Sequence, residues 1–94
     1  MNFSHYQVHF SGQVQGVGFR YTAVQLARKF KNLTGYVRNM PDGRVEMIAE
    51  TDEITFKDFL AAIRESPLGF SIKNTEVKKN LVANRQFTSF DIHF

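Results

Sequence analysis

The stretch YQVHFSGQVQGVGFRYTAVQLARKF, residues 6–30, changes its hydrophobic period part-way along and so predicts a strand, a glycine-rich loop and a helix. Before the loop, Tyr6, Val8 and Phe10 alternate with polar residues, which is the pattern of a half-buried strand; we expect it to span residues 3–10. After the loop, apolar residues recur at helical spacing and predict a helix from about Tyr21 to Asn32, with its buried stripe at Phe19, Ala23, Leu26, Ala27 and Phe30.

The rest of the chain supplies four further strands and a second helix. Residues 35–39 have strand character, and Pro41-Asp42-Gly43-Arg44 is a strong hairpin-turn signal before a second alternating run at 44–50. A stripe of apolar residues predicts a helix over residues 52–65, which Ser66-Pro67 ends because the residue before a proline disfavours helix. Strands at 71–78 and 89–94 complete the chain, and residues 80–88 are the least regular connection.

This order of elements predicts the fold class. It is β-α-β-β-α-β plus a short C-terminal strand, which favours an α+β, ferredoxin-like sandwich: an antiparallel sheet with two helices on one face. A chain of 94 residues can build one core but is too short for two, so we expect a single domain spanning 1–94. Because this fold carries many unrelated functions, the function has to be argued from the site.

The composition excludes several kinds of chemistry. There is no cysteine, so disulfides, thiolate metal sites and a cysteine nucleophile are excluded. His5, His9 and His93 have neither HxxxH nor HExxH spacing, and we expect them to be strand or terminal residues that bind no metal. The N-terminus has no apolar run of the length that a signal peptide or membrane span needs, so we expect a cytoplasmic protein with no membrane partner.

The glycine-rich loop, residues 12–18, suits either an anion-binding cradle or a plain structural turn. Its glycines permit positive φ, and its amides join the unpaired amides of the helix N-terminus, where the helix dipole favours an anion. Arg20 adds a planar fork that can bind two phosphate oxygens at once. The loop is neither a Walker motif nor GxGxxG, because it lacks GK[ST] and has other glycine spacing. Loop composition alone leaves both alternatives open.

The chain returns to the end of the domain that holds this loop at Asn39. A helix over residues 21–32 rises roughly 18 Å, and a strand over 35–39 comes back roughly 15 Å. In the expected topology one strand separates residues 35–39 from the first strand, a lateral offset of about 10 Å. We therefore expect Arg20, the loop and Asn39 to share one small site. The alternative is that Asn39 is only the strand-end residue that starts the hairpin turn.

Two motifs, GQVQGVGFR at 12–20 and GYVRNMPDGRV at 35–45, together resemble the signatures of the acylphosphatase family, G-x-V-Q-G-V-x-F/Y-R and G-aromatic-V-K/R-N-x3-G-x-V. The first matches at every defined position, with Gly18 at the variable one. In the second, Tyr36 replaces the more frequent tryptophan. The family's usual glycine six residues after Val45 is Thr51 here, at the end of an expected strand. Length, element order and the ending SFDIHF also suit the family, so the resemblance covers essentially the whole chain.

The resemblance implies a metal-independent hydrolase without a cofactor. It would cleave the carboxyl–phosphate bond of small-molecule acyl phosphates to a carboxylate and inorganic phosphate, which would also inhibit competitively. By the same resemblance, Arg20 binds the phosphate, Asn39 orients the attacking water, and the backbone of six residues forms the phosphate-binding loop: Gln15, Gly16, Val17, Gly18, Phe19 and Arg20. Such a spare site is chemically sufficient, because a leaving carboxylate with a conjugate-acid pKa of about 4 needs no strong general acid.

Two functions without catalysis remain as alternatives. RNA-recognition domains share this element order, and the chain is basic, with a formal charge of +3, and rich in phenylalanine. Those domains place base-stacking aromatics on the first and third strands, whereas the third strand here, RVEMIAE, has none, so we expect no nucleic-acid partner. A non-catalytic phosphate-binding module, or a domain that only supports a larger assembly, is disfavoured by the presence of both Arg20 and Asn39.

Overall fold

The computed structural model describes residues 3–82 and 84–94. The elements follow one another in the expected order, with one short 3-10 helix, η1, added before the fourth strand. Their bounds are β1 (Ser4–Gly12), α1 (Phe19–Ala27), β2 (Thr34–Asn39), β3 (Val45–Thr51), α2 (Glu53–Glu65), η1 (Pro67–Phe70), β4 (Ile72–Asn80) and β5 (Phe90–His93).

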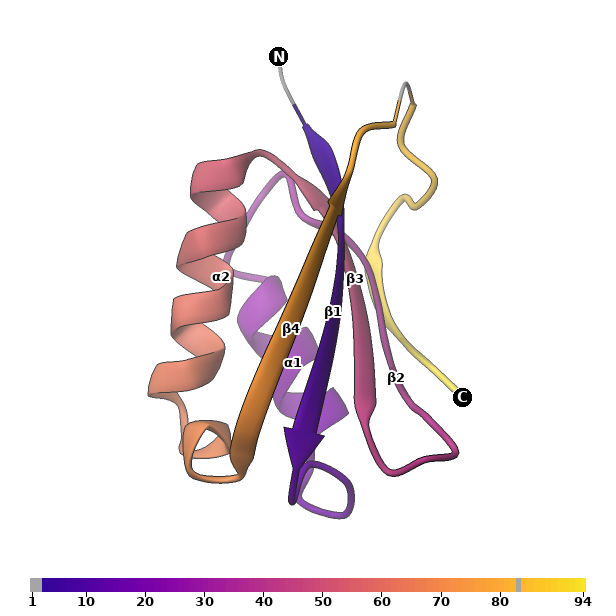
Figure 1. Ribbon diagram of the computed structural model, residues 1–94. Helices are drawn as coiled ribbons and strands as arrows, with labels where there is room; N and C mark the ends of the chain where they lie inside the picture. Colours follow the sequence, from indigo (N-terminus) through magenta and orange to yellow (C-terminus); the bar gives the residue numbers. More distant parts are fainter. Residues whose placement is uncertain (1–2, 83) are drawn as a thin grey trace.

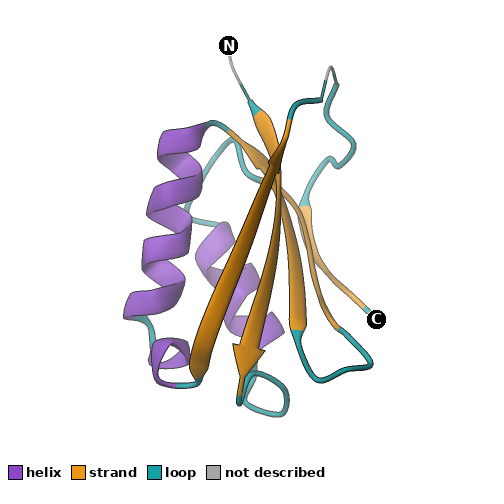
Figure 2. Ribbon diagram, viewed as in Figure 1, coloured by secondary structure: helices purple, strands orange, loops and turns teal. Residues whose placement is uncertain are grey.

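The five strands form one mixed sheet in the order β4-β1-β3-β2-β5, and both helices cover the same face of it (Figures 1 and 2). β1 pairs antiparallel with β3 and β4, and β2 pairs antiparallel with β3. The ferredoxin-like α+β arrangement is thus confirmed. The sequence pattern does not give the direction of the additional C-terminal strand, and in the structure β5 runs parallel to β2. Strands β4 and β5 are the two edges of the sheet. Because β5 is parallel to β2, both of these strands begin at the same end of the sheet.

An aromatic core between sheet and helices fixes where α1 starts. Tyr6, Val8 and Phe10 of β1 face this core and are buried, as the alternation predicts. Phe19, the first residue of α1, is buried against Phe10, with 4.9 Å between ring centroids. Burying a side chain of this size contributes roughly 2 kcal/mol. The helix N-terminus is therefore held against the end of β1, and the loop between them has to be compact.

Strand β3 is buried on both faces, which the alternating pattern of residues 44–50 does not predict. On the face away from the helices, the Glu46 carboxylate is surrounded by four polar partners: Gln7, His9, Tyr36 and Arg38. Farther along the strand, the Glu50 carboxylate contacts the His5 ring and accepts hydrogen bonds from the backbone amides of Gln86 and Phe87. Neighbouring side chains and the connection to β5 therefore cover this second face.

Helix α1 ends at Ala27, five residues before the expected end near Asn32. The amides of Lys29 and Phe30 donate to the carbonyls of Leu26 and Ala27, three residues back, so the chain tightens into a turn. Phe30 still packs on the core, edge to face with Phe59. Its helical spacing therefore reflects a side chain that reaches the core from the turn.

Helix α2 matches its expected range, and Asp52 is its N-cap. The Asp52 carboxylate accepts a hydrogen bond from the amide of Thr55 at 2.8 Å, which satisfies one of the free donors of the first turn. Ser66 ends the helix, as the sequence predicts, and also caps η1, a short helix that the sequence pattern does not predict. The Ser66 hydroxyl accepts a hydrogen bond from the amide of Leu68.

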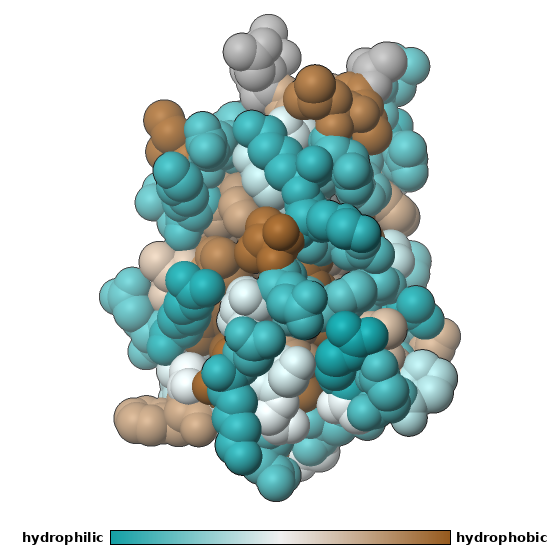
Figure 3. Space-filling view, in the orientation of Figure 1, coloured by the Kyte–Doolittle hydropathy of each residue, from teal (hydrophilic) through white to brown (hydrophobic). Residues whose placement is uncertain are grey.

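Strand β4 is an exposed edge of the sheet. The face in Figure 3, with β4 toward the viewer, is largely hydrophilic with separate apolar patches. Lys73, Lys78 and Lys79 are exposed along it, and such charges oppose pairing with another strand.

Within residues 3–82 and 84–94, no helix has the length and apolar character needed to cross a membrane.

Candidate active site

The loop between β1 and α1 depends on two glycines with left-handed backbone. Gly16 has φ of 78° and Gly18 has φ of 76°, values that favour glycine. A Cβ added at either position would have no heavy atom within 4 Å, so conformation, rather than lack of space, requires glycine here. Gly18 is also the N-cap of α1 and has no side chain to cap the first amides. Because the first turn carries no acidic residue either, this helix end suits an exogenous anion.

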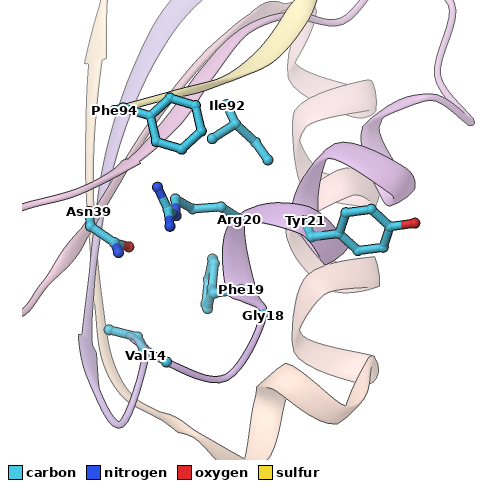
Figure 4. A pocket seen from close by; sticks show the side chains of 9 residues that line it. Val14, Gly18, Phe19, Arg20, Tyr21, Asn39, Ile92 and Phe94 are labelled. Carbon is cyan, nitrogen blue, oxygen red and sulfur yellow. The ribbon is translucent and has the colours of Figure 1, made fainter.

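A pocket opens beside this loop at the end of the sheet where the β2–β3 hairpin also lies (Figures 1 and 4). The volume of the pocket, including its open mouth, is about 470 Å³. Three parts of the chain line it: the loop and helix start, the end of β2, and the end of β5. The lining residues are Val14, Gly16, Gly18, Phe19, Arg20 and Tyr21, then Asn39, then Ile92 and Phe94.

Arg20 and Asn39 meet in this pocket, as the sequence predicts. Figure 4 shows the Asn39 amide facing the same space as the Arg20 guanidinium, and both side chains are half-buried. Strand β3 alone separates β2 from β1, which is the lateral arrangement the sequence analysis assumed. In the part of the chain that the structure describes, no carboxylate forms an ion pair with Arg20. Its positive charge is therefore available to a bound anion.

Not all of the expected phosphate-binding loop lines the pocket. Gly16, Gly18, Phe19 and Arg20 do, whereas Gln15 and Val17 are not among the lining residues. Val17 is instead exposed to solvent.

The Gln15 side chain connects the loop to the hairpin. Its amide nitrogen donates to the carbonyl oxygens of Met40 at 2.8 Å and of Arg44 at 2.9 Å. These two residues close the hairpin themselves, because the Met40 amide donates to the Arg44 carbonyl at 2.8 Å. Since Met40 directly follows Asn39, Gln15 links the element that carries Arg20 to the element that carries Asn39.

The three histidines lie outside the pocket, on or near the sheet face opposite the helices. His5 contacts Glu50 at 3.2 Å, His9 contacts Glu46 at 3.1 Å, and His93 stacks on Tyr36 with 4.3 Å between ring centroids. Across residues 3–82 and 84–94, His, Asp and Glu side chains nowhere gather in threes as ligands of a metal ion would.

Sequence reasoning missed the contribution of β5 to the pocket. Ile92 of β5 and Phe94, which directly follows the strand, both line the pocket, and the Phe94 ring centroid lies 5.2 Å from the guanidinium carbon of Arg20. The alternation in SFDIHF was the available signal. It could not be interpreted without knowing that this strand would lie beside β2.

Comparison with known proteins assigns the chain to a family. The family model for acylphosphatase matches residues 6–92. The chain belongs to the acylphosphatase family. It is 40% identical over 88 residues to an acylphosphatase of Archaeoglobus fulgidus, covering 94% of this chain and 96% of that relative. It is 46% identical over 85 residues to an acylphosphatase of Pseudothermotoga lettingae, covering 90% of this chain and 92% of the relative.

The fold is similar to that of a solved member of the acylphosphatase family. The crystal structure of acylphosphatase from Bacillus subtilis aligns with a TM-score of 0.83 at 35% identity, covering 97% of this chain and 99% of that one. The family resemblance drawn from the two signatures is therefore confirmed. So is the expectation that this chain is an enzyme, an acylphosphatase.

Proposed function

We propose that this acylphosphatase hydrolyses acyl phosphates by direct attack of water on phosphorus, without a metal ion, and that Arg20, the loop amides and Asn39 carry the reaction. The products are a carboxylate and inorganic phosphate. The observation that supports this most is the meeting of Arg20 and Asn39 in one pocket at the N-terminus of α1. The two residues come from separate signatures and separate elements, so their convergence has to be produced by the fold.

The phosphate is bound by positive charge and by backbone donors. The Arg20 guanidinium can donate to two non-bridging oxygens at once, and it has no competing carboxylate among the described residues. The loop containing Gly16 and Gly18 brings backbone close to the ligand, and the N-terminus of α1 adds amides and the positive end of the helix dipole. Inorganic phosphate, the product, fits the same donors and is expected to inhibit competitively.

The attacking water is oriented by Asn39. Its side-chain oxygen accepts a hydrogen bond from the water and so directs a water lone pair toward phosphorus. Attack in line with the leaving oxygen then breaks the bond between phosphorus and the acyl oxygen, and the carboxylate leaves with the electron pair. A neutral amide is too weak a base to take the proton, which passes to a phosphoryl oxygen and leaves with the product phosphate.

The absence of an acid in the pocket fits this leaving group. Of the nine residues that line the described pocket, only Arg20 and Tyr21 have titratable side chains, and the Tyr21 ring points away from the guanidinium in Figure 4. A carboxylate whose conjugate acid has a pKa of about 4 departs without protonation. Catalysis is then mainly positioning and stabilisation of charge on the phosphoryl oxygens.

The mechanism is tested by hydrolysing benzoyl phosphate in water enriched in ¹⁸O, with a chelator present. We expect turnover to continue with the chelator and the label to appear in inorganic phosphate, because water attacks phosphorus. Label in benzoate would show attack at the carbonyl carbon and would refute the assignment of Asn39. Loss of turnover that returns when a divalent metal is added would contradict the metal-independent reaction.

A further inference from the structure

Two apolar side chains at the C-terminal end of β5, Ile92 in the strand and Phe94 directly after it, border the pocket beside the proposed phosphate site. Ile92 is partly buried and packs against the core, which anchors the end of this strand. Phe94, two residues later, is fully exposed, and yet its ring lies 5.2 Å from the Arg20 guanidinium carbon. Figure 4 shows both side chains on the same side of Arg20. An exposed phenylalanine at the mouth of a polar pocket is an apolar surface that a ligand can cover.

The chemistry of phosphoryl transfer requires the acyl group to lie away from the water. The attacking and leaving oxygens stand on opposite sides of phosphorus. If Asn39 holds the water, the acyl group extends from the side of the phosphate that faces away from Asn39. In Figure 4, Asn39 and the start of α1 lie on opposite sides of the Arg20 guanidinium, and the Phe94 ring and Ile92 both lie above it. An acyl group that extends away from Asn39 can therefore contact Ile92 and Phe94 beside the guanidinium.

We infer that Phe94, supported by Ile92, forms an acyl-binding subsite that contacts an aromatic acyl group more extensively than an acetyl group. The inference rests on the proposed function, since it takes the phosphate to be bound at Arg20. A benzoyl group can stack against the Phe94 ring, whereas an acetyl group offers only one methyl. Tyr21 is not included, because its ring points away from the pocket.

Phe94 also contacts Arg20, so two effects of its removal have to be separated. Loss of the cation–π contact would change the orientation of Arg20 and would affect every acyl phosphate equally. Loss of the acyl contact would affect benzoyl phosphate alone. The ratio of kcat/KM for benzoyl phosphate to kcat/KM for acetyl phosphate isolates the second effect. The different intrinsic reactivities of the two compounds cancel when this ratio is compared between variants.

The test measures this ratio in the wild type, in Phe94→Ala, in Phe94→Leu, and in Phe70→Ala as the control. Phe70 lies on η1 and is 97% exposed, so it matches Phe94 as an exposed aromatic outside the pocket. We expect Phe94→Ala to lower the ratio roughly 10-fold, mainly through a higher KM for benzoyl phosphate, as for the loss of a stacked aromatic pair. Phe94→Leu should give an intermediate ratio, and Phe70→Ala should leave the ratio unchanged.

Two outcomes would overturn the inference. The first is a ratio within about twofold of wild type in Phe94→Ala, which includes an equal fall of both kcat/KM values that would assign Phe94 to Arg20 alone. The second is an equal fall of the ratio in Phe70→Ala, which would show a non-specific effect. Each of these leaves acyl-phosphate hydrolysis itself intact. The proposed function would fail separately, if the wild type turned over neither compound.

Discussion

The side-chain nitrogen of Gln15 lies 2.8 Å from the carbonyl oxygen of Met40 and 2.9 Å from that of Arg44. One side chain of the proposed phosphate-binding loop thus uses both of its amide hydrogens on the hairpin that follows Asn39. The relative position of Arg20 and Asn39 therefore depends on a contact between loops as well as on the sheet.

We predict that Gln15→Ala lowers kcat/KM by about 10-fold or more, because the loop and the hairpin lose their link and a misplaced group is costly to phosphoryl transfer. Two lost hydrogen bonds should also reduce the free energy of unfolding by about 2 kcal/mol. Gln15→Glu should not rescue activity, since a carboxylate cannot donate to two carbonyls. Gln13→Ala, an exposed side chain in the same loop, is the matched control in steady-state kinetics and urea unfolding. A Gln15→Ala variant with the kinetics of wild type would show that the link is dispensable.

We predict that Arg20→Ala loses phosphate binding together with turnover. Removing a two-pronged charged donor from the phosphate should lower kcat/KM by roughly 100-fold or more, and inhibition by inorganic phosphate should weaken in parallel. Arg28→Ala, an exposed arginine just after the same helix, should behave as wild type. Competitive inhibition by phosphate that survived intact in Arg20→Ala would assign phosphate binding to other groups.

We predict that Glu46 makes the fold sensitive to acid. Burial raises the pKa of the Glu46 carboxyl, but hydrogen bonds from Arg38, His9, Tyr36 and Gln7 outweigh burial and lower the pKa from 4.5 to about 2. A pKa lowered by folding stabilises the protein above the unfolded-state pKa, and this stabilisation disappears as the pH falls toward the folded-state pKa. The full contribution is about 3 kcal/mol, of which about 2 kcal/mol should be lost by pH 3.

Urea unfolding at pH 6 and pH 3 measures this contribution of Glu46. The loss of stability between the two pH values should be about 2 kcal/mol smaller in Glu46→Gln than in wild type. Glu65→Gln, at an exposed helix end, should show nearly the wild-type loss. If wild type and Glu46→Gln lost the same free energy between pH 6 and pH 3, other carboxyl groups would account for the acid sensitivity.

Most of the fold could be predicted because local patterns specify it. The alternation at Tyr6, Val8 and Phe10 and the Pro41–Arg44 turn are local signals, because each depends only on residues that are close together in the sequence. The end of α1 could not be predicted, because Phe30 reaches the core from a turn at the spacing that a helix would also give. The burial of Glu46 was equally hidden, since its partners come from β1 and β2 and an acidic residue in an alternating strand ordinarily faces water.

The candidate site likewise has features that could be predicted from the sequence and features that could not. The convergence of Arg20 and Asn39 in one pocket could be predicted, because the two signatures and the topology together bring both residues to one end of the sheet. Gln15 was expected to contribute only its backbone amide to the loop. The hydrogen bonds from its side chain to the hairpin depend on how the loop and the hairpin turn pack together, which the sequence pattern does not specify. Phe94 was missed because the pairing of β5 with β2 is a long-range event with no local signal in the sequence.

The most direct test of the account is Asn39→Ala, measured for both phosphate binding and turnover, with Asn80→Ala at the end of β4 as the matched control. If Asn39 orients the water while Arg20 and the loop bind the phosphate, Asn39→Ala should keep the Kd for inorganic phosphate within about twofold. Its kcat should nevertheless fall by roughly 100-fold, as for the loss of a group that acts on the reacting atoms. A kcat within about twofold of wild type would contradict the account, because some other group would then hold the water.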